Sequence, residues 1–160
     1  MKKLKTDKFN LKKLLKTIKD EDKDELKHSF GKDYAKKFLK ICFKASEKYF
    51  YGDDCSNPIA IGGVEPFLKD NLKIGQIWLI SSKNFTEQNI ELFKYINSKI
   101  NEFKKEYDIL YNIIYKSNFK ALKWLSRCGF KILDTECDDY KLFYYAKGGI
   151  NFDLRYITGK

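Results

Sequence analysis

Hydrophobic residues near the start of the chain recur with the period of an α-helix. Four of them share one helical face at i, i+3, i+4 and i+7, with lysines on the other face: Leu11, Leu14, Leu15 and Ile18. The charged stretch from Asp20 to Asp24 predicts a break, and Glu25 to Phe30 predicts one or two further helical turns that end at Gly31.

A third helix is expected after Asp33, whose side chain is suited to an N-cap. Its predicted stripe of apolar positions consists of Tyr34, Phe38, Ile41, Ala45 and Tyr49. The residues from Gly52 to Pro58 then predict a loop.

Short apolar runs in the rest of the chain predict β-strands. They are Ile59–Val64, Gly75–Ser81 and Asp108–Tyr115, followed by an antiparallel pair, Phe130–Leu133 and Lys141–Ala146. Gly62 and Gly63 indicate a bulge or a close approach between backbones. The polar segment Lys69–Lys73 predicts a turn.

Two helices are expected between these strands. A long one begins near Thr86, a suitable N-cap with Glu87 in the first turn, and continues to about Lys105. A shorter one is capped by Ser117 or Asn118 and carries Ala121, Leu122, Trp124 and Leu125. Alternation of strands and helices with antiparallel flanks predicts a single α+β layered domain over residues 1–160. Within it we expect a basic helical region at residues 1–52, a core at 55–147 and a tail at 148–160.

Charge is unevenly distributed along the chain. The net charge is +10, and residues 1–50 carry sixteen lysines against eight acidic residues. A basic segment would suit nucleic acid, but thirty lysines against two arginines is typical of AT-rich codons, and nucleic-acid sites favour arginine. Nucleic-acid binding is therefore the less favoured interpretation.

Several other classes of protein find no support in the composition. No run approaches the roughly 20 apolar residues of a membrane-spanning helix, and no apolar segment of a signal peptide follows the basic N-terminus. Four cysteines without a C-x-x-C pair and the single His28 offer no spacing for a metal site. We expect free thiols and a protein that is neither secreted nor bound to a membrane.

The segment from Asn118 to Phe130 resembles the last conserved motif of the GNAT acetyltransferase superfamily. The matching positions are Asn118, Ala121, Trp124, Gly129 and Phe130. The resemblance implies a GNAT-like (acyl-CoA N-acyltransferase) mixed central sheet flanked by helices. The two strands Gln76–Ser81 and Asp108–Tyr115 should then be neighbours that splay at one end, and Trp124 and Phe130 should both be buried.

The chain as a whole is similar to a GNAT-related family of short-tailed bacteriophages, which includes an internal virion protein. Four ordered stretches carry this resemblance: Asp20–Glu25, Ile59–Val64, Gln76–Ser82 and Tyr107–Phe130. It implies a role in virion assembly, in the virion or the host cytoplasm, with other virion proteins or a host protein as partners.

In GNAT enzymes the pyrophosphate of acetyl-CoA binds to backbone amides of a glycine-containing loop at the start of the central helix. The corresponding segment here, Ser81–Gln88, contains no glycine, and it places the acidic Glu87 where phosphate should lie. We therefore expect no cofactor. If acetyl-CoA is bound, the resemblance implies that Ser81, Ser82, Lys83 and Asn118 contact it.

The residues for proton transfer are also atypical. Leu125 stands at the position where active GNATs commonly carry the tyrosine that protonates the CoA thiolate. Tyr111 and Tyr115 are weak substitutes, and Glu65 is a weak candidate for the base. Two functions follow: a non-catalytic docking or assembly protein, or an acetyltransferase that acts on a small amine or a protein lysine.

Overall fold

Seven strands form a mixed sheet in the order β1-β2-β3-β4-β5-β7-β6. The computed structural model describes residues 2–4, 8–44, 47–52, 58–86 and 89–157, and it describes only the backbone of residues 2–4, 8–10, 41–44, 47–48 and 50. The chain divides into two compact units, Met1–Glu65 with Trp78–Tyr95 and Pro66–Ile77 with Ile96–Lys160.

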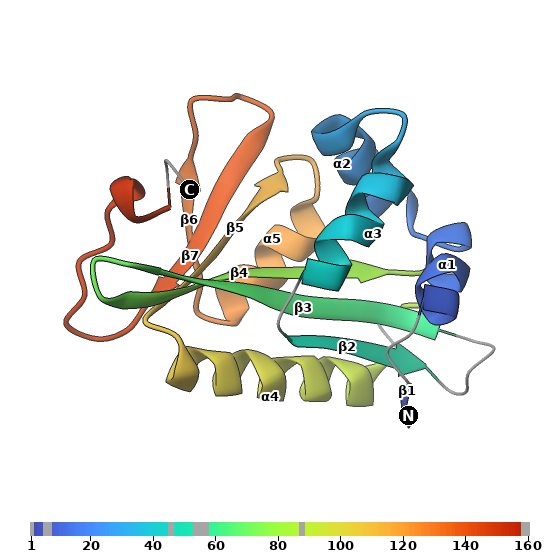
Figure 1. Ribbon diagram of the computed structural model, residues 1–160, viewed down its shortest axis with the longest axis horizontal. Coiled ribbons are helices and arrows are strands. Elements are labelled where there is room, and N and C mark those ends of the chain that lie inside the picture. Colours follow the sequence, from blue (N-terminus) through green and yellow to red (C-terminus); the bar gives the residue numbers. More distant parts are fainter. Residues whose placement is uncertain (1, 5–7, 45–46, 53–57, 87–88, 158–160) are drawn as a thin grey trace. The chain divides into compact units, whose positions relative to one another are not determined.

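Among its described residues, the first unit combines three complete helices and the start of a fourth with the first strands of the sheet (Figure 1). Its elements are β1 (Lys2–Leu4), α1 (Lys8–Lys16), α2 (Asp20–Phe30), α3 (Tyr34–Lys44), β2 (Glu47–Gly52), most of β3 (Pro58–Lys69) and the end of β4 (Leu72–Ser81). The helices bury Leu14, Leu26 and Phe38 in one cluster with Ile61 of β3 and Ile80 of β4. Trp78 packs against this cluster. Its ring lies edge-on to the ring of Phe38, with the two centroids 5.4 Å apart.

Two predictions for the first unit are wrong. Asp20–Asp24 is the start of α2 and not a break, because acidic residues in a first turn are stabilised by the helix dipole. The helical stripe drawn through Tyr49 is also wrong, since α3 ends at Lys44 and Tyr49 lies on β2, paired with Gly62. Aromatic residues in succession favour strands, and β3 supplies the partner. Ala45 lies outside the described residues.

Gly62 confirms the close approach of two backbones. A side chain there would meet the carbonyl oxygen of Trp78 and Cδ1 of Leu79, each at 3.2 Å. The described pairing of β2 with β3 shifts register at Tyr51/Gly52 and is regular at Gly62, which pairs with Tyr49. The turn predicted at Lys69–Lys73 is shorter in the structure and consists of Asp70 and Asn71. Both residues have positive φ angles, as in tight β-hairpins.

The second unit contains β5 (Ile109–Tyr115), α5 (Phe119–Arg127), β6 (Lys131–Asp134), β7 (Tyr140–Ala146) and most of α4 (Ile90–Glu106). The predicted antiparallel pair is confirmed as β6 and β7, and β7 also pairs with β5. The last turn of α5 leads through Gly129, at φ +87°, to Phe130, whose buried ring meets Phe143 edge-on at 5.3 Å.

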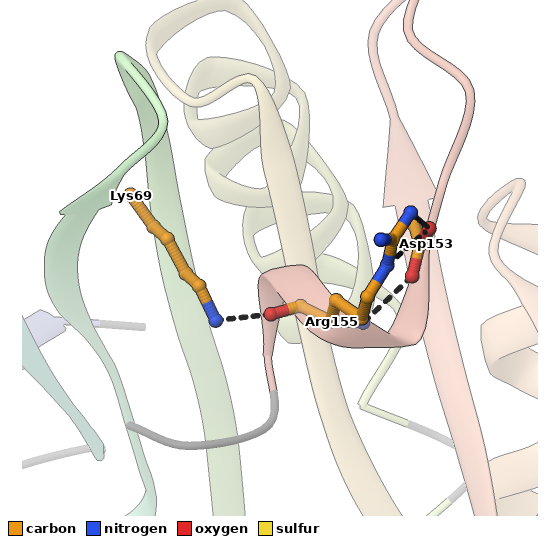
Figure 2. Close-up of polar contacts among 3 residues, drawn as sticks. All are labelled: Lys69, Asp153 and Arg155. Atoms are coloured by element: carbon orange, nitrogen blue, oxygen red, sulfur yellow. Dashed lines mark hydrogen bonds and ion pairs between the residues drawn. The ribbon is translucent and has the colours of Figure 1, made fainter.

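The C-terminal tail, for which the sequence predicts no structure, covers part of the sheet in the second unit. Four of its side chains pack against the cluster of Ile74, Ile109, Tyr111 and Leu142: Ile150, Phe152, Tyr156 and Ile157. Asp153 caps the short 3₁₀ helix Leu154–Tyr156 and pairs with Arg155, and Lys69 donates to the Arg155 carbonyl (Figure 2). Hydrogen bonds from the side chain and the backbone amide of Arg155 lower the pKa of Asp153 to about 2.

Trp124 is less buried than predicted. Its side chain is half-buried, and its indole N–H donates to Asn97 Oδ1 at 3.2 Å. The neighbouring Leu125 is the buried residue of α5 instead. The expected burial is therefore confirmed for Phe130 and wrong for Trp124, because the helix turns Leu125 toward the sheet.

Candidate functional site at the ends of the central strands

Strands β4 and β5 are parallel neighbours that pair over only a portion of their lengths. Ile74, Gly75 and Gln76 pair with Ile109, Leu110 and Tyr111, and no further pairs follow, although both strands continue. The predicted neighbourhood and the predicted parting of these strands are thus both confirmed. Where two strands part, their backbone groups become available to other partners.

The side-chain amides of Gln76 and Asn112 form hydrogen bonds where the pairing of β4 with β5 ends. Asn112 Nδ2 donates to the Ile77 carbonyl at 2.8 Å, and Gln76 Nε2 donates to Asn112 Oδ1 at 3.2 Å. The Asn112 side chain therefore donates a hydrogen bond to the carbonyl of Ile77, the first residue of β4 after its last pair with β5. Sequence reasoning assigned no role to this pair, and the only signal was the presence of two amides in otherwise apolar strands.

Replacing Asn112 by leucine is expected to lower the free energy of unfolding by about 1–3 kcal/mol, because the Ile77 carbonyl and the Gln76 amide each lose a half-buried partner. Urea denaturation measures the change. Asn97→Leu, which also removes an amide that accepts from exposed groups, is the control and should cost less. Equal losses of unfolding free energy in the two variants would show that the hydrogen bonds of Asn112 do not stabilise the end of the β4–β5 pairing.

The backbone amides of the loop after β4 donate hydrogen bonds to other groups of the protein. The N–H groups of Ser82 and Lys83 donate to the carbonyls of Ile59 and Thr17, at 2.8 and 2.7 Å. Five further N–H groups bond within the loop or to Asp22: those of Ser81, Asn84, Phe85, Thr86 and Asn89. Every described amide from Ser81 to Asn89 thus has a partner within the protein.

The start of the central helix also differs from the prediction. Helix α4 begins at Ile90, and Thr86 does not cap it, because both its amide and its hydroxyl donate to Asn89 Oδ1. Glu87 lies outside the described residues. An acidic residue is nevertheless present in the first turn of α4, since Glu91 is exposed there.

A carboxylate holds the end of β4. Asp22 Oδ2 accepts from the backbone N–H of Ser81 at 2.7 Å and from its hydroxyl at 2.9 Å. Burial of the carboxyl group raises the pKa of Asp22, and the two hydrogen bonds from Ser81 oppose this effect. The structure thus gives Asp22 a contact with a residue 59 positions later in the chain.

The segment around Asp22 lies along the end of β4 almost as an added strand. The Lys19 amide donates to the Ser81 carbonyl at 2.9 Å, and Ile18 forms an antiparallel bridge with Ser82. Lys83, a cation within this loop, is 3.4 Å from Asp20 in an exposed ion pair. The segment from Thr17 to Asp22 thus accepts from the amides of Ser81 and Lys83 and places Asp20 beside the Lys83 ammonium group.

These contacts test whether the loop suits the pyrophosphate of acetyl-CoA. Phosphate binding at a helix start needs inward-pointing amides without a partner and a positive local potential. In the described part of the loop the amides are already hydrogen-bonded, and the buried carboxylate of Asp22 accepts from Ser81. The first turn of α4 contains the acidic Glu91. Residues 87 and 88 of this loop lie outside the described residues, and the expectation that no acetyl-CoA binds stays a prediction.

The other predicted site residues are placed as follows. Asn118 caps α5, with Oδ1 3.4 Å from the Ala121 amide, which agrees with its predicted capping role. Tyr111 is buried beside Phe67, and Tyr115 is half-buried with its ring edge-on to Tyr140 at 5.9 Å. Glu65 lies half-buried in β3, in the first unit. The catalytic roles of these residues remain predictions.

Metal and membrane sites are not found among the described residues. No three metal-ligating side chains gather there, and none of the described helices has the length and apolar character to cross a membrane. Cys128 and Cys137 are free thiols, and Cys55 lies outside the described residues. Burial raises the pKa of the Cys128 thiol, which donates to Asn97.

Comparison with known proteins relates the chain to acetyltransferases at the level of fold. No family model matches it, and no curated protein matches it. PH1933 from Pyrococcus horikoshii OT3 is 18% identical with a TM-score of 0.64, covering 91% of this chain and 95% of that one. An acetyltransferase of Bacillus subtilis in complex with CoA is 16% identical with a TM-score of 0.58, covering 91% and 96%.

A third solved structure agrees with these two. A mutant spermidine N-acetyltransferase from Vibrio cholerae is 17% identical, with a TM-score of 0.52 over 71% of this chain and 72% of that one. Together with the mixed sheet and the parting of β4 and β5, these similarities show the fold. The protein has the α+β fold of the GNAT (acyl-CoA N-acyltransferase) class.

Proposed function

We propose that this protein uses the GNAT fold to bind other proteins and does not transfer acetyl groups. The observation that carries the proposal is the internal bonding of every described amide from Ser81 to Asn89. An enzyme of this fold needs such amides for the cofactor. Here their partners are fixed parts of the protein, including the Asp22 carboxylate.

The position of the general acid supports the same conclusion. Leu125, which stands where active GNATs commonly carry tyrosine, is 6% exposed, so its surroundings are shaped for an apolar side chain. An aliphatic side chain has no proton to transfer to a thiolate.

The biological setting of the proposal rests on the sequence resemblance to the phage family. We infer a role in virion morphogenesis, including the internal core of the head, or as a docking protein for another virion protein or a host protein. The site of action would then be the host cytoplasm, the virion or both.

The alternative, an N-acetyltransferase acting on a small amine or a protein lysine, is favoured by two observations. Strands β4 and β5 part as they do in the enzymes of this fold, and one structural neighbour holds CoA. In that case acetyl-CoA would be the cofactor. The choice between the two functions depends on whether this cofactor binds.

Isothermal titration calorimetry with acetyl-CoA tests the proposal. Charge-assisted hydrogen bonds contribute about 1.5–3 kcal/mol each, so the loss of two weakens binding by roughly a hundredfold or more. We expect no dissociation constant tighter than about a millimolar. The positive control is a catalytically active acetyltransferase of the same fold.

A micromolar dissociation constant would overturn the proposal and support the enzyme. The turnover of Glu65→Gln, Tyr111→Phe and Tyr115→Phe would then be compared with that of the unmodified protein. Loss of turnover in one of them would identify the proton-transfer residue.

A further inference from the structure

The C-terminal tail, residues 148–157, packs against a cluster of sheet residues in the second unit that is almost completely buried. The four residues of this cluster are between 0% and 6% exposed: Ile74, Ile109, Tyr111 and Leu142. The tail side chains that pack against it are only half-buried: Ile150, Phe152, Tyr156 and Ile157. The tail is thus a thin apolar cover, and we call the four sheet residues the covered cluster.

Side chains hold this cover in place. The Phe152 ring stacks on the Tyr144 ring of β7, with the two centroids 3.8 Å apart. Among the described residues, the tail amides that donate hydrogen bonds find their acceptors within residues 147–157. From outside the tail, Lys69 donates to the Arg155 carbonyl, as Figure 2 shows. The tail therefore adds no strand to the sheet and is joined to it mainly by apolar contacts.

Two glycines link the tail to the residues that follow β7. Gly148 and Gly149 are both exposed, and a Cβ atom built on either would meet no atom within 4 Å. Gly149 has a φ of +87°, which glycine adopts without strain. The link can therefore change its direction without the loss of any packing.

We propose that copies of this protein exchange their C-terminal tails, so that the tail of one copy packs on the covered cluster of a second copy. An open cluster would expose apolar sheet residues to water, which is unfavourable, so the cluster stays covered by its own tail or by an identical one. The contacts are the same in both cases because the two copies have the same sequence. Reciprocal exchange covers both clusters and gives a closed dimer.

This inference goes beyond the proposed binding role and does not depend on it. The covered cluster and the tail both belong to the second unit, whereas the loop from Ser81 to Asn89 belongs to the first. Tail exchange and acetyl-CoA binding are measured separately, and either result can fail alone.

A labelled peptide with the sequence of residues 148–160 tests whether the covered cluster accepts a second tail. Fluorescence anisotropy with the full-length protein should show weak binding, because the protein's own tail competes. Phe152→Ser in the full-length protein weakens this competitor and should tighten peptide binding by about tenfold or more. Leu154→Ser, at a position that is 53% exposed, should leave binding unchanged. Equal binding by the two variants, or none by either, would overturn the proposal.

Deletion of Gly148 and Gly149 tests exchange without altering the apolar contacts. The shortened link should prevent the tail from turning back onto its own sheet, so we expect a dimer in sedimentation velocity at micromolar concentration. This dimer should persist at an ionic strength of about 1 M, because its contacts are mainly apolar. Gly148→Ala keeps the length of the link and should have the monomer content of the unmodified protein. A deletion variant that stays monomeric would contradict tail exchange.

Engineered cysteines show which copy supplies the tail, and they do so even if Phe152→Ser fails to fold. One variant carries Tyr144→Cys and the other Phe152→Cys, so the disulfide between these two positions can form only between chains. Mass spectrometry should find it in an oxidised equimolar mixture of the two variants. Leu154→Cys in place of Phe152→Cys is the control, since the Leu154 side chain is exposed. Absence of the disulfide from the first mixture would refute the exchange of tails.

Discussion

Replacing Leu125 by alanine is expected to lower the free energy of unfolding by about 2–5 kcal/mol, the range for a buried leucine that leaves a cavity. Leu125 is 6% exposed and is the buried residue of α5. The backbone hydrogen bond from the Phe130 amide to the Leu125 carbonyl, at 3.1 Å, is retained in the variant, so the loss reports on the side chain alone. Urea denaturation followed by circular dichroism gives the change.

Trp124→Ala is the matched comparison on the same helix. Its side chain is half-buried and its indole N–H donates to Asn97, so we expect a smaller loss of about 1–2 kcal/mol. A larger loss for Trp124 than for Leu125 would mean that α5 is rotated and that the tryptophan faces the sheet.

Replacing Asp22 by alanine is expected to cost about 2–4 kcal/mol, because the amide and the hydroxyl of the buried Ser81 both lose their acceptor. Asp22→Asn is the matched control, since its amide oxygen still accepts from the Ser81 amide. The asparagine variant should lose much less at neutral pH because it also removes a buried charge. Equal losses in the two variants would show that the contact with Ser81 does not hold the end of β4.

The same pair of variants gives a test in pH. Burial raises the folded-state pKa of Asp22 above the ordinary value of 3.8, so the folded protein binds the proton more tightly than the unfolded chain. The stability that Asp22 contributes is therefore greatest below its ordinary pKa and is lost as pH rises through the raised value. We expect the stability of the unmodified protein relative to Asp22→Asn to increase as pH falls from neutral toward 4.

A difference between the two proteins that does not change with pH would contradict this assignment. Asp153 does not affect the comparison. Its pKa of about 2 lies below the ordinary value, which gives the opposite dependence, and it is present in both proteins.

Local signals were sufficient for much of the fold. The apolar runs predicted β4, β5 and β7, and the spacing of leucines predicted α1, because burial of one face imposes its period on the sequence. The cap of α5 was predicted as Ser117 or Asn118 from residue type, and the structure has Asn118, since capping involves only neighbours in the chain.

The functional loop could be interpreted only in part. The lack of glycine from Ser81 to Gln88 indicated poor phosphate binding, and that much is a property of residue types. Where the amides of the loop find their partners depends on Thr17 and Asp22, far earlier in the chain. A pattern of neighbouring residues has no means of indicating such a contact.

The sequence by itself determined the strand and helix types of the core, the turn after α5 and the absence of the usual acid and phosphate-binding glycines. Only the tertiary structure decided that Tyr49 joins a strand, that Leu125 and not Trp124 faces inward, and that Asp22 binds Ser81, 59 positions away. The physical reason is that periodicity and capping act over one or two turns of chain. Strand partners, burial and carboxylate contacts arise between segments that only folding brings together.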